Sequence, residues 1–157
     1  MEKSELLVRR YKTSDHQQIK ELHKLALMQF GANIMIGHLE DDLDQIEEVY
    51  LKNGEFLVME YQGKIIGMGG LRDLNGIGEI KRMRIHPDFQ GQGIGQMLLT
   101  LLENKVKEMG SKTIRLDTTA KQIVAQNLYI KNGYKETGRR RIDSIDTDQI
   151  HFEKDLN

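Results

Sequence analysis

The chain has 157 residues, a length typical of one domain with a single hydrophobic core. Its 23 lysines and arginines nearly balance 24 aspartates and glutamates, so the charge pattern gives no indication of nucleic-acid binding. The absence of cysteine excludes disulfides, thiolate metal sites and a cysteine nucleophile.

Hydrophobic periodicity and turn residues divide the chain into alternating helices and strands. The predicted elements, in chain order, are strand 5–11, helices 15–30 and 40–52, strands 55–61, 64–72 and 77–86, helix 93–109, strand 113–118, helix 121–132, and strands 134–142 and 147–155. We expect the first helix to begin with Thr13 or Ser14 as N-cap and Gln17 in a capping box. Gln62-Gly63 is typical of a tight hairpin turn.

This order of elements predicts an α/β (α+β) domain with a mixed sheet and helices on both faces. Strand 77–86, helix 93–109 and strand 113–118 should form a right-handed parallel crossover. No repeat, low-complexity tract or linker interrupts the chain, and the single proline, Pro87, lies between two predicted elements. We therefore expect one domain over residues 1–157.

Three glycines, Gly91, Gly93 and Gly95, lie between strand 77–86 and helix 93–109. Such a turn lets backbone amides converge on an anion, and the helix N-terminus adds the positive end of its dipole. The spacing excludes a P-loop, because Gln96 and Met97 follow where Lys and Ser/Thr are required. It also excludes a dinucleotide fingerprint, so Asp117 after the next strand is not a ribose-binding acid.

Two motifs together resemble the GNAT superfamily of acetyl-CoA-dependent N-acetyltransferases. The first is Gln90-x-x-Gly93-x-Gly95, and the second is Ala125-x-x-Leu128-Tyr129-x-Lys131-x-Gly133-Tyr134. The opening Leu7-Val8-Arg9-Arg10 with Ser14-Asp15 is similar to the usual first strand and helix start of the family. The resemblance implies a mostly antiparallel sheet of six to seven strands with one splayed parallel pair.

The resemblance also implies how acetyl-CoA is bound. The amides of the glycine turn would hold the pyrophosphate; these residues are Gln90, Gly91, Gln92, Gly93, Ile94 and Gly95. The main chain of Met83, Arg84 and Ile85 would pair with the pantetheine arm like an added strand, with their side chains in the core. The family often has an asparagine seven residues before the motif tyrosine; here the position is Gln122, and Asn127 lies one turn away.

Two side chains are candidates for proton transfer. Tyr129 matches the family tyrosine that points at the CoA sulfur, and a phenol with a reference pKa near ~10 is protonated at neutral pH. The alternative is a packing role at a helix end. Glu79 occupies the position where some family members place a glutamate base; alternatively, it is the ion-pair partner of Lys81. Charges on both faces of strand 77–86 indicate a bulge or an exposed groove.

We therefore expect transfer of an acetyl group from acetyl-CoA to a primary amine by direct attack in a ternary complex, without a metal. The acceptor is predicted to be a small-molecule amine, with a peptide as alternative. Its charge stays open, because the acidic segment after Glu40 favours a cation and the run Arg139-Arg140-Arg141 favours an anion. A non-catalytic CoA-binding module and a protein acetylase remain alternatives, and a homodimer is left open. No apolar run reaches the ~18 residues of a membrane span, so we expect a cytoplasmic protein.

Overall fold

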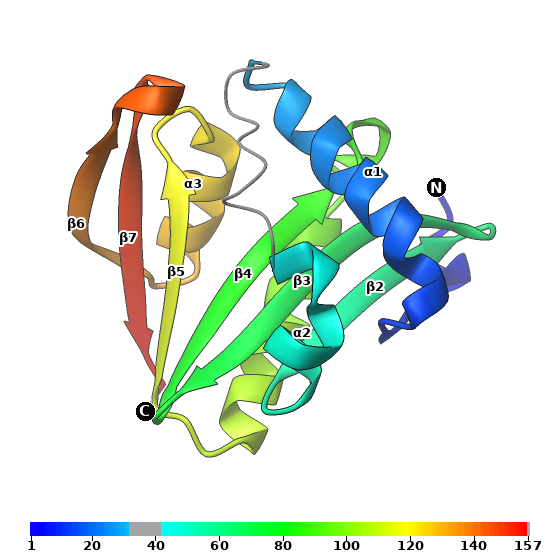
Figure 1. Ribbon diagram of the computed structural model, residues 1–157, viewed down its shortest axis with the longest axis horizontal. Coiled ribbons are helices and arrows are strands. Elements are labelled where there is room, and N and C mark those ends of the chain that lie inside the picture. The colour runs from blue at the N-terminus through cyan, green and yellow to red at the C-terminus, as the bar shows by residue number, and fades with distance from the viewer. Residues whose placement is uncertain (32–41, 157) are drawn as a thin grey trace.

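The computed structural model describes residues 1–31 and 42–156, and Figure 1 shows its arrangement. Its main elements are β1 (Leu6–Arg10), α1 (His16–Met28), β2 (Glu55–Tyr61), β3 (Lys64–Leu74), β4 (Ile77–Ile85), α2 (Ile94–Glu108), β5 (Thr113–Thr119), α3 (Ile123–Lys131), β6 (Lys135–Ile142) and β7 (Thr147–Asp155). The predicted strands and the predicted helices 15–30, 93–109 and 121–132 are thus present, with bounds that differ by a few residues.

The strands form one seven-stranded sheet in the order β1-β2-β3-β4-β5-β7-β6. Every neighbouring pair is antiparallel except β4 and β5, which are parallel. The prediction of a mixed, mostly antiparallel sheet with one parallel pair is confirmed. Gln62 and Gly63 form the predicted hairpin turn between β2 and β3, with φ angles of 50° and 80°.

Helices cover both faces of the sheet, and each face has its own hydrophobic core. Helices α2 and α3 lie on one face, where Leu98, Leu102 and Tyr129 pack with sheet residues such as Ile80 and Phe152. Helix α1 and residues 42–51 lie on the other face, as Figure 1 shows for α1 crossing β3 and β4. The sheet therefore separates an α2/α3 side from an α1 side.

Two local predictions about the N-terminal half are wrong. The predicted capping box with Gln17 is absent, because a 3-10 turn, Thr13–Asp15, precedes α1. The Asp15 carboxylate instead accepts the Lys12 amide (2.8 Å) and forms an ion pair with Arg9 (2.8 Å). Within the described residues, the predicted helix 40–52 is replaced by a 3-10 turn at 42–44 and a single π-helical turn, Glu47–Leu51. Residues 40 and 41 lie outside the described part. Packing of fully buried Leu43, Ile46 and Tyr50 on the sheet, rather than helix propensity, fixes this segment.

A bulge in β4 changes the direction of that strand. The β3–β4 register shifts between Met68 and Gly70, and Arg82 has a φ of 60°, unusual for a residue other than glycine. Its guanidinium is held by Asp42 through Nε (3.1 Å) and Nη2 (2.8 Å). The bulge that the charge pattern indicated is therefore present, and an ion pair from residues 42–51 holds it.

Strands β4 and β5 pair only at their beginnings, over Ile77–Ile80 and Thr113–Leu116. Beyond Ile80 they diverge, which Figure 1 shows as two halves of the sheet that meet near the C-terminus and separate toward the ends of both strands. The predicted splayed pair is confirmed. Among the residues that the structure describes, one edge of β4 and one edge of β5 have no strand partner there.

A buried hydrogen bond ties the end of α3 to α2. Tyr134 follows α3, and its hydroxyl donates to Glu103 Oε2 (2.7 Å). Lys154 Nζ donates to the same oxygen (3.1 Å). Burial and the neighbouring Glu103 raise the pKa of Tyr134, so the phenol remains a donor. Tyr134 is thus a buried core residue.

Replacing Tyr134 by Phe should destabilise the fold by ~1–3 kcal/mol, because buried Glu103 loses a hydrogen-bond donor. Urea unfolding measures the change. Tyr61→Phe is the matched control, since the Tyr61 hydroxyl has only a 3.4 Å contact from exposed Gln62. Equal unfolding midpoints for the two variants would show that the Glu103 contact contributes nothing.

Candidate active site

The divergence of β4 and β5 opens a cleft of about 310 Å³ that passes between the two halves of the sheet. The α2/α3 side contributes Ala125 and Tyr129, and α1 contributes Leu27. The strands supply most of the remaining lining: Ile80, Lys81, Arg82, Met83 and Arg84 of β4, Asp117, Thr118 and Thr119 of β5, Arg140 and Ile142 of β6, and Gln149 of β7.

Tyr129 places a phenol in the lining of this cleft. It is only 6% exposed, yet its side chain lines the cavity, and burial raises the pKa of its phenol. Its hydroxyl makes no hydrogen bond with any residue in the described part of the chain. A phenol that is protonated and directed into a cavity can donate its proton to a bound group.

The open edge of β4 carries the three residues expected to pair with a pantetheine arm. On its other edge, Arg84 pairs with Met68 and Ile85 with Gly67 of β3. Met83 and Ile85 pack against the core on the α2/α3 side, as expected for their side chains. The Met83 carbonyl accepts Nη1 of Arg84 (2.8 Å), so this carbonyl already has a partner.

The glycine turn ends at α2 with its amides directed away from internal acceptors. Gly91 and Gly93 have φ angles of 78° and 82°, and Gly93 is the N-cap of α2 without a side-chain cap. Among described residues, no acceptor takes the N–H groups from Gly91 to Gln96. Unsatisfied amides at the N-terminus of a 15-residue helix form a site for an anion such as a pyrophosphate.

Gln90 and Gln122 shape the turns around this region. The Gln90 side chain donates to the Ile85 carbonyl (2.9 Å) and closes the loop onto the end of β4. Gln122 Oε1 accepts the Thr118 hydroxyl (2.9 Å) and the Thr119 amide (3.0 Å), which fixes the turn from β5 into α3. Gln122 lines the cleft, whereas Asn127 is exposed on α3 and is not a lining residue.

Glu79 lies outside the lining of the cleft. It is opposite Arg72 on β3, and its Oε1 accepts from Arg72 Nε (2.9 Å) and Nη2 (2.5 Å). Its ion-pair partner is thus Arg72, and not Lys81. Neither contact reaches Oε2. The structure does not bring Glu79 together with Tyr129.

Several polar residues of the α1 side belong to the cleft although their sequence pattern did not single them out as site residues. Asp117 lines it and is hydrogen-bonded to His151 Nδ1 (2.5 Å). Arg140 lines it and donates to Gln149 Oε1 (3.1 Å). Strand alternation does separate Arg140 from Arg139 and Arg141, but sequence alone does not show that its face borders a cleft.

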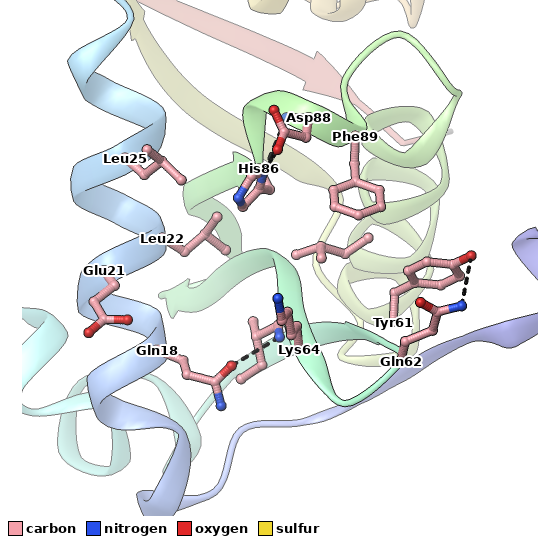
Figure 2. Close-up of a pocket in the computed structure, with 12 residues that line it drawn as sticks. Gln18, Glu21, Leu22, Leu25, Tyr61, Gln62, Lys64, His86, Asp88 and Phe89 are labelled. Atoms are coloured by element: carbon pink, nitrogen blue, oxygen red, sulfur yellow. Dashed lines mark hydrogen bonds and ion pairs between the residues drawn. The ribbon is translucent and has the colours of Figure 1, made fainter. Parts of the chain in front are cut away.

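A second, larger cleft of about 550 Å³ lies between α1, the β2–β3 turn and the start of the glycine turn (Figure 2). The ring of Phe89 contacts the rings of Tyr61 and His86 edge-to-face there, with 5.6 Å between ring centroids in each pair. His86 Nδ1 accepts the Asp88 amide (3.0 Å), so its role is in the loop. None of the predicted catalytic residues lines this cleft, and the open β4 edge and Tyr129 favour the smaller one as the active site.

Comparisons with known proteins agree with this geometry. The model of the acetyltransferase (GNAT) family matches residues 19–134, well over half of the chain. The chain belongs to the GNAT acetyltransferase family. It is an acyltransferase, and the resemblance of the two motifs is confirmed. The N-acetyltransferase YjgM of Escherichia coli is 29% identical over 136 residues, which cover 82% of this chain and 81% of YjgM.

Solved structures show the same fold. A GNAT-family acetyltransferase from Staphylococcus aureus superposes with a TM-score of 0.84 at 25% identity, covering 97% of this chain and 99% of that one. The acetyltransferase YncA from Salmonella typhimurium, solved with acetyl-CoA, gives a TM-score of 0.78 at 19% identity over 98% and 95% of the two chains. In residues 1–31 and 42–156, no helix is long and apolar enough to cross a membrane, and no three His, Cys, Asp or Glu side chains form a metal-binding group.

Gly95 is the position where a side chain tests the anion site most directly. A side chain at Gly93 strains the backbone by itself because of the positive φ, whereas at Gly95 a Cβ would meet Leu128 and Ile85 at ordinary distances of 3.7 and 4.0 Å. The Gly95→Val protein should therefore fold. Its side chain would crowd the bound pyrophosphate and weaken CoA binding by ~10-fold or more, which corresponds to the ~1–3 kcal/mol that overpacking costs. Calorimetry with CoA measures the affinity.

Gly138→Val in β6 is the control, since a Cβ there meets only the His151 ring at 3.9 Å. An unchanged CoA affinity in folded Gly95→Val protein would show that the turn does not bind the pyrophosphate.

Proposed function

We propose that this protein transfers an acetyl group from acetyl-CoA to the primary amine of a small molecule, by direct attack with both substrates bound in the β4–β5 cleft. The observation that carries the proposal is the buried, protonated Tyr129 hydroxyl beside the open edge of β4. The acetyl-CoA bound by its fold neighbour YncA supports the choice of donor. When bound, acetyl-CoA supplies a thioester carbonyl that an amine can attack.

The residues of the chain fit this donor. The amides from Gly91 to Gly95, with the N-terminus of α2, would hold the pyrophosphate, and the Gln90 side chain keeps the loop in place. The backbone of Met83, Arg84 and Ile85 would pair with the pantetheine arm in place of β5. Gln122 also lines the cleft, and its side-chain Nε2 can donate to the pantetheine arm, because its three side-chain hydrogen bonds all use Oε1. Asn127 is exposed on α3 and would contact acetyl-CoA only outside the cleft.

Two proton transfers are assigned to side chains. Tyr129 holds a proton at its hydroxyl and would give it to the departing sulfur, because a desolvated phenol remains protonated until a strongly basic group is next to it. Glu79 would receive the ammonium proton through water at Oε2, since Arg72 occupies only Oε1. The Arg72 pair is the structural alternative for this residue.

The modest size of the cleft favours a small-molecule acceptor over a protein. Residues of α1, β4 and β6 surround it on the α1 side, and a volume of about 310 Å³ suits a compact ligand. A thiol-release assay with a panel of amines, amino acids and peptides tests the proposal. Binding of acetyl-CoA without thiol release with any of them would favour a non-catalytic module, and turnover with peptides alone would favour a protein acetylase.

Tyr129→Phe should lower kcat by ~10²-fold, the scale of positioned acid catalysis, with little change in acetyl-CoA affinity. The reason is that the phenol proton is needed only as the carbon–sulfur bond breaks. Tyr134→Phe is the matched control, because the Tyr134 hydroxyl is bound to Glu103 and Tyr134 does not line the cleft. Equal kcat values for Tyr129→Phe and wild type would assign Tyr129 a packing role.

Glu79→Gln should slow the turnover of an alkyl amine at neutral pH and recover partly as pH rises, because an amine with a pKa near ~10 then loses its proton in solution. An α-amino substrate, whose pKa is nearer ~8, should show a smaller defect. A pH–rate profile from pH 6 to 10 measures both.

Arg72→Gln is the control for the Glu79 variant, since it removes the same ion pair and keeps the carboxylate. Parallel losses in Glu79→Gln and Arg72→Gln, without a pH-dependent recovery, would make the role of Glu79 structural.

A further inference from the structure

The α1 side of the active-site cleft is rich in cations. Lys81, Arg82 and Arg84 of β4 and Arg140 of β6 line the cleft. Among the lining residues in the described part of the chain, Asp117 is the single carboxylate. Such an excess of one charge in a cavity attracts a ligand of the opposite charge.

Ion pairs inside the protein neutralise only part of this charge. Arg82 is paired with Asp42 (2.8 Å), and Asp117 Oδ1 is hydrogen-bonded to His151 Nδ1 (2.5 Å). Lys81 and Arg140 have no carboxylate within ion-pair distance in residues 1–31 and 42–156. Asp42 is close enough for the charge of Lys81 to lower its pKa, and Gln149, which accepts from Arg140, also donates to Asp117 (3.4 Å). Four cationic side chains, Lys81, Arg82, Arg84 and Arg140, therefore face the cleft against two nearby carboxylates among these residues, Asp42 and Asp117.

The neighbours of Arg140 show that its position is distinct. Arg139 is paired with Glu136 (2.9 Å), and Arg141 is paired with Asp143 (3.2 Å) and Asp146. Arg140 alternates to the opposite face of β6, where its register partner Gln149 accepts its Nη2 (3.1 Å). A neutral amide thus orients the Arg140 guanidinium and leaves its charge available to a ligand.

The position of Arg140 relative to Tyr129 gives the subsite a direction. Gln149 pairs with both Arg140 and Thr119, so these residues lie on one face of the sheet. Tyr129 packs against Phe152, on the opposite face, and reaches the cleft from α3. Ile142 and Ile145 add apolar lining on the side of Arg140. A ligand in the cleft can therefore direct one end toward Tyr129 and the other toward Arg140.

We propose that Arg140, supported by Lys81, binds an anionic group of the acceptor, so that the substrate is a small primary amine with a carboxylate or phosphonate on a short apolar stem. The guanidinium presents a planar fork of N–H donors that matches either anion. The ammonium group would lie at the other end, toward Tyr129. This inference rests on the proposed acetyl transfer in the same cleft.

Three amines with comparable stems test the subsite: 4-aminobutyrate, 3-aminopropylphosphonate and butylamine, which lacks the anion. The wild-type protein should acetylate at least one of the two anionic amines with a kcat/KM ~10-fold or more above that of butylamine, the scale of one charge-assisted hydrogen bond. Arg140→Gln should raise KM for the preferred anionic amine by a similar factor, and by more than it changes KM for butylamine. Arg140→Lys, which keeps the charge but loses the fork, should be intermediate.

Arg139→Gln is the matched control, since Arg139 is adjacent in sequence and lies on the other face of β6. Equal kcat/KM values for butylamine and both anionic amines, or equal effects of Arg139→Gln and Arg140→Gln, would overturn the anionic subsite while the acetyl transfer stands. Absence of turnover with every amine would instead contradict the proposed function. Calorimetry of 3-aminopropylphosphonate and 4-aminobutyrate with the CoA-bound protein then decides the subsite: binding that Arg140→Gln weakens supports it, and any other result overturns it.

Discussion

The divergence of β4 and β5 is the constraint on which the rest of the site depends. A strand edge that lacks a partner exposes hydrogen-bonding groups, and a protein normally covers such an edge or pairs it. Here the two strands pair only as far as Ile80 and Leu116, and the open stretch borders a cavity between two helical layers. The exposed backbone is therefore protected from other chains but accessible to an extended ligand arm.

Contacts from residues distant in sequence hold the strands in this divergent arrangement. The bulge at Arg82 is held by Asp42, whose Oδ2 accepts both Arg82 Nε and the buried Tyr50 hydroxyl. On the opposite side, Gln122 fixes the turn from β5 into α3, and Tyr134 bonded to Glu103 joins the end of α3 to α2. The cleft thus has a rigid frame on each side, and Tyr129 lies between two of these fixed points.

The two faces of the sheet divide the chemistry of the cleft. The α2/α3 side provides unsatisfied amides and a phenol, groups suited to a phosphate and a leaving thiolate. The α1 side provides guanidinium and ammonium groups beside apolar side chains. A cleft that passes through the sheet lets two ligands approach from opposite sides and meet near the open edge of β4, without overlapping binding surfaces.

The sequence by itself determined the strands, the helices α1, α2 and α3, the parallel pair and the glycine turn, because each depends on local periodicity, glycine placement or a contiguous motif. It also identified Tyr129, whose motif surrounds it in the chain. Only the tertiary structure decided the partner of Glu79, since Arg72 is brought opposite by hairpin register, and only it showed that residues 42–51 form short turns fixed by packing. The faces that border the cleft were equally beyond the sequence: alternation distinguishes Arg140 from its neighbours, but the divergence of two distant strands decides which face meets a ligand.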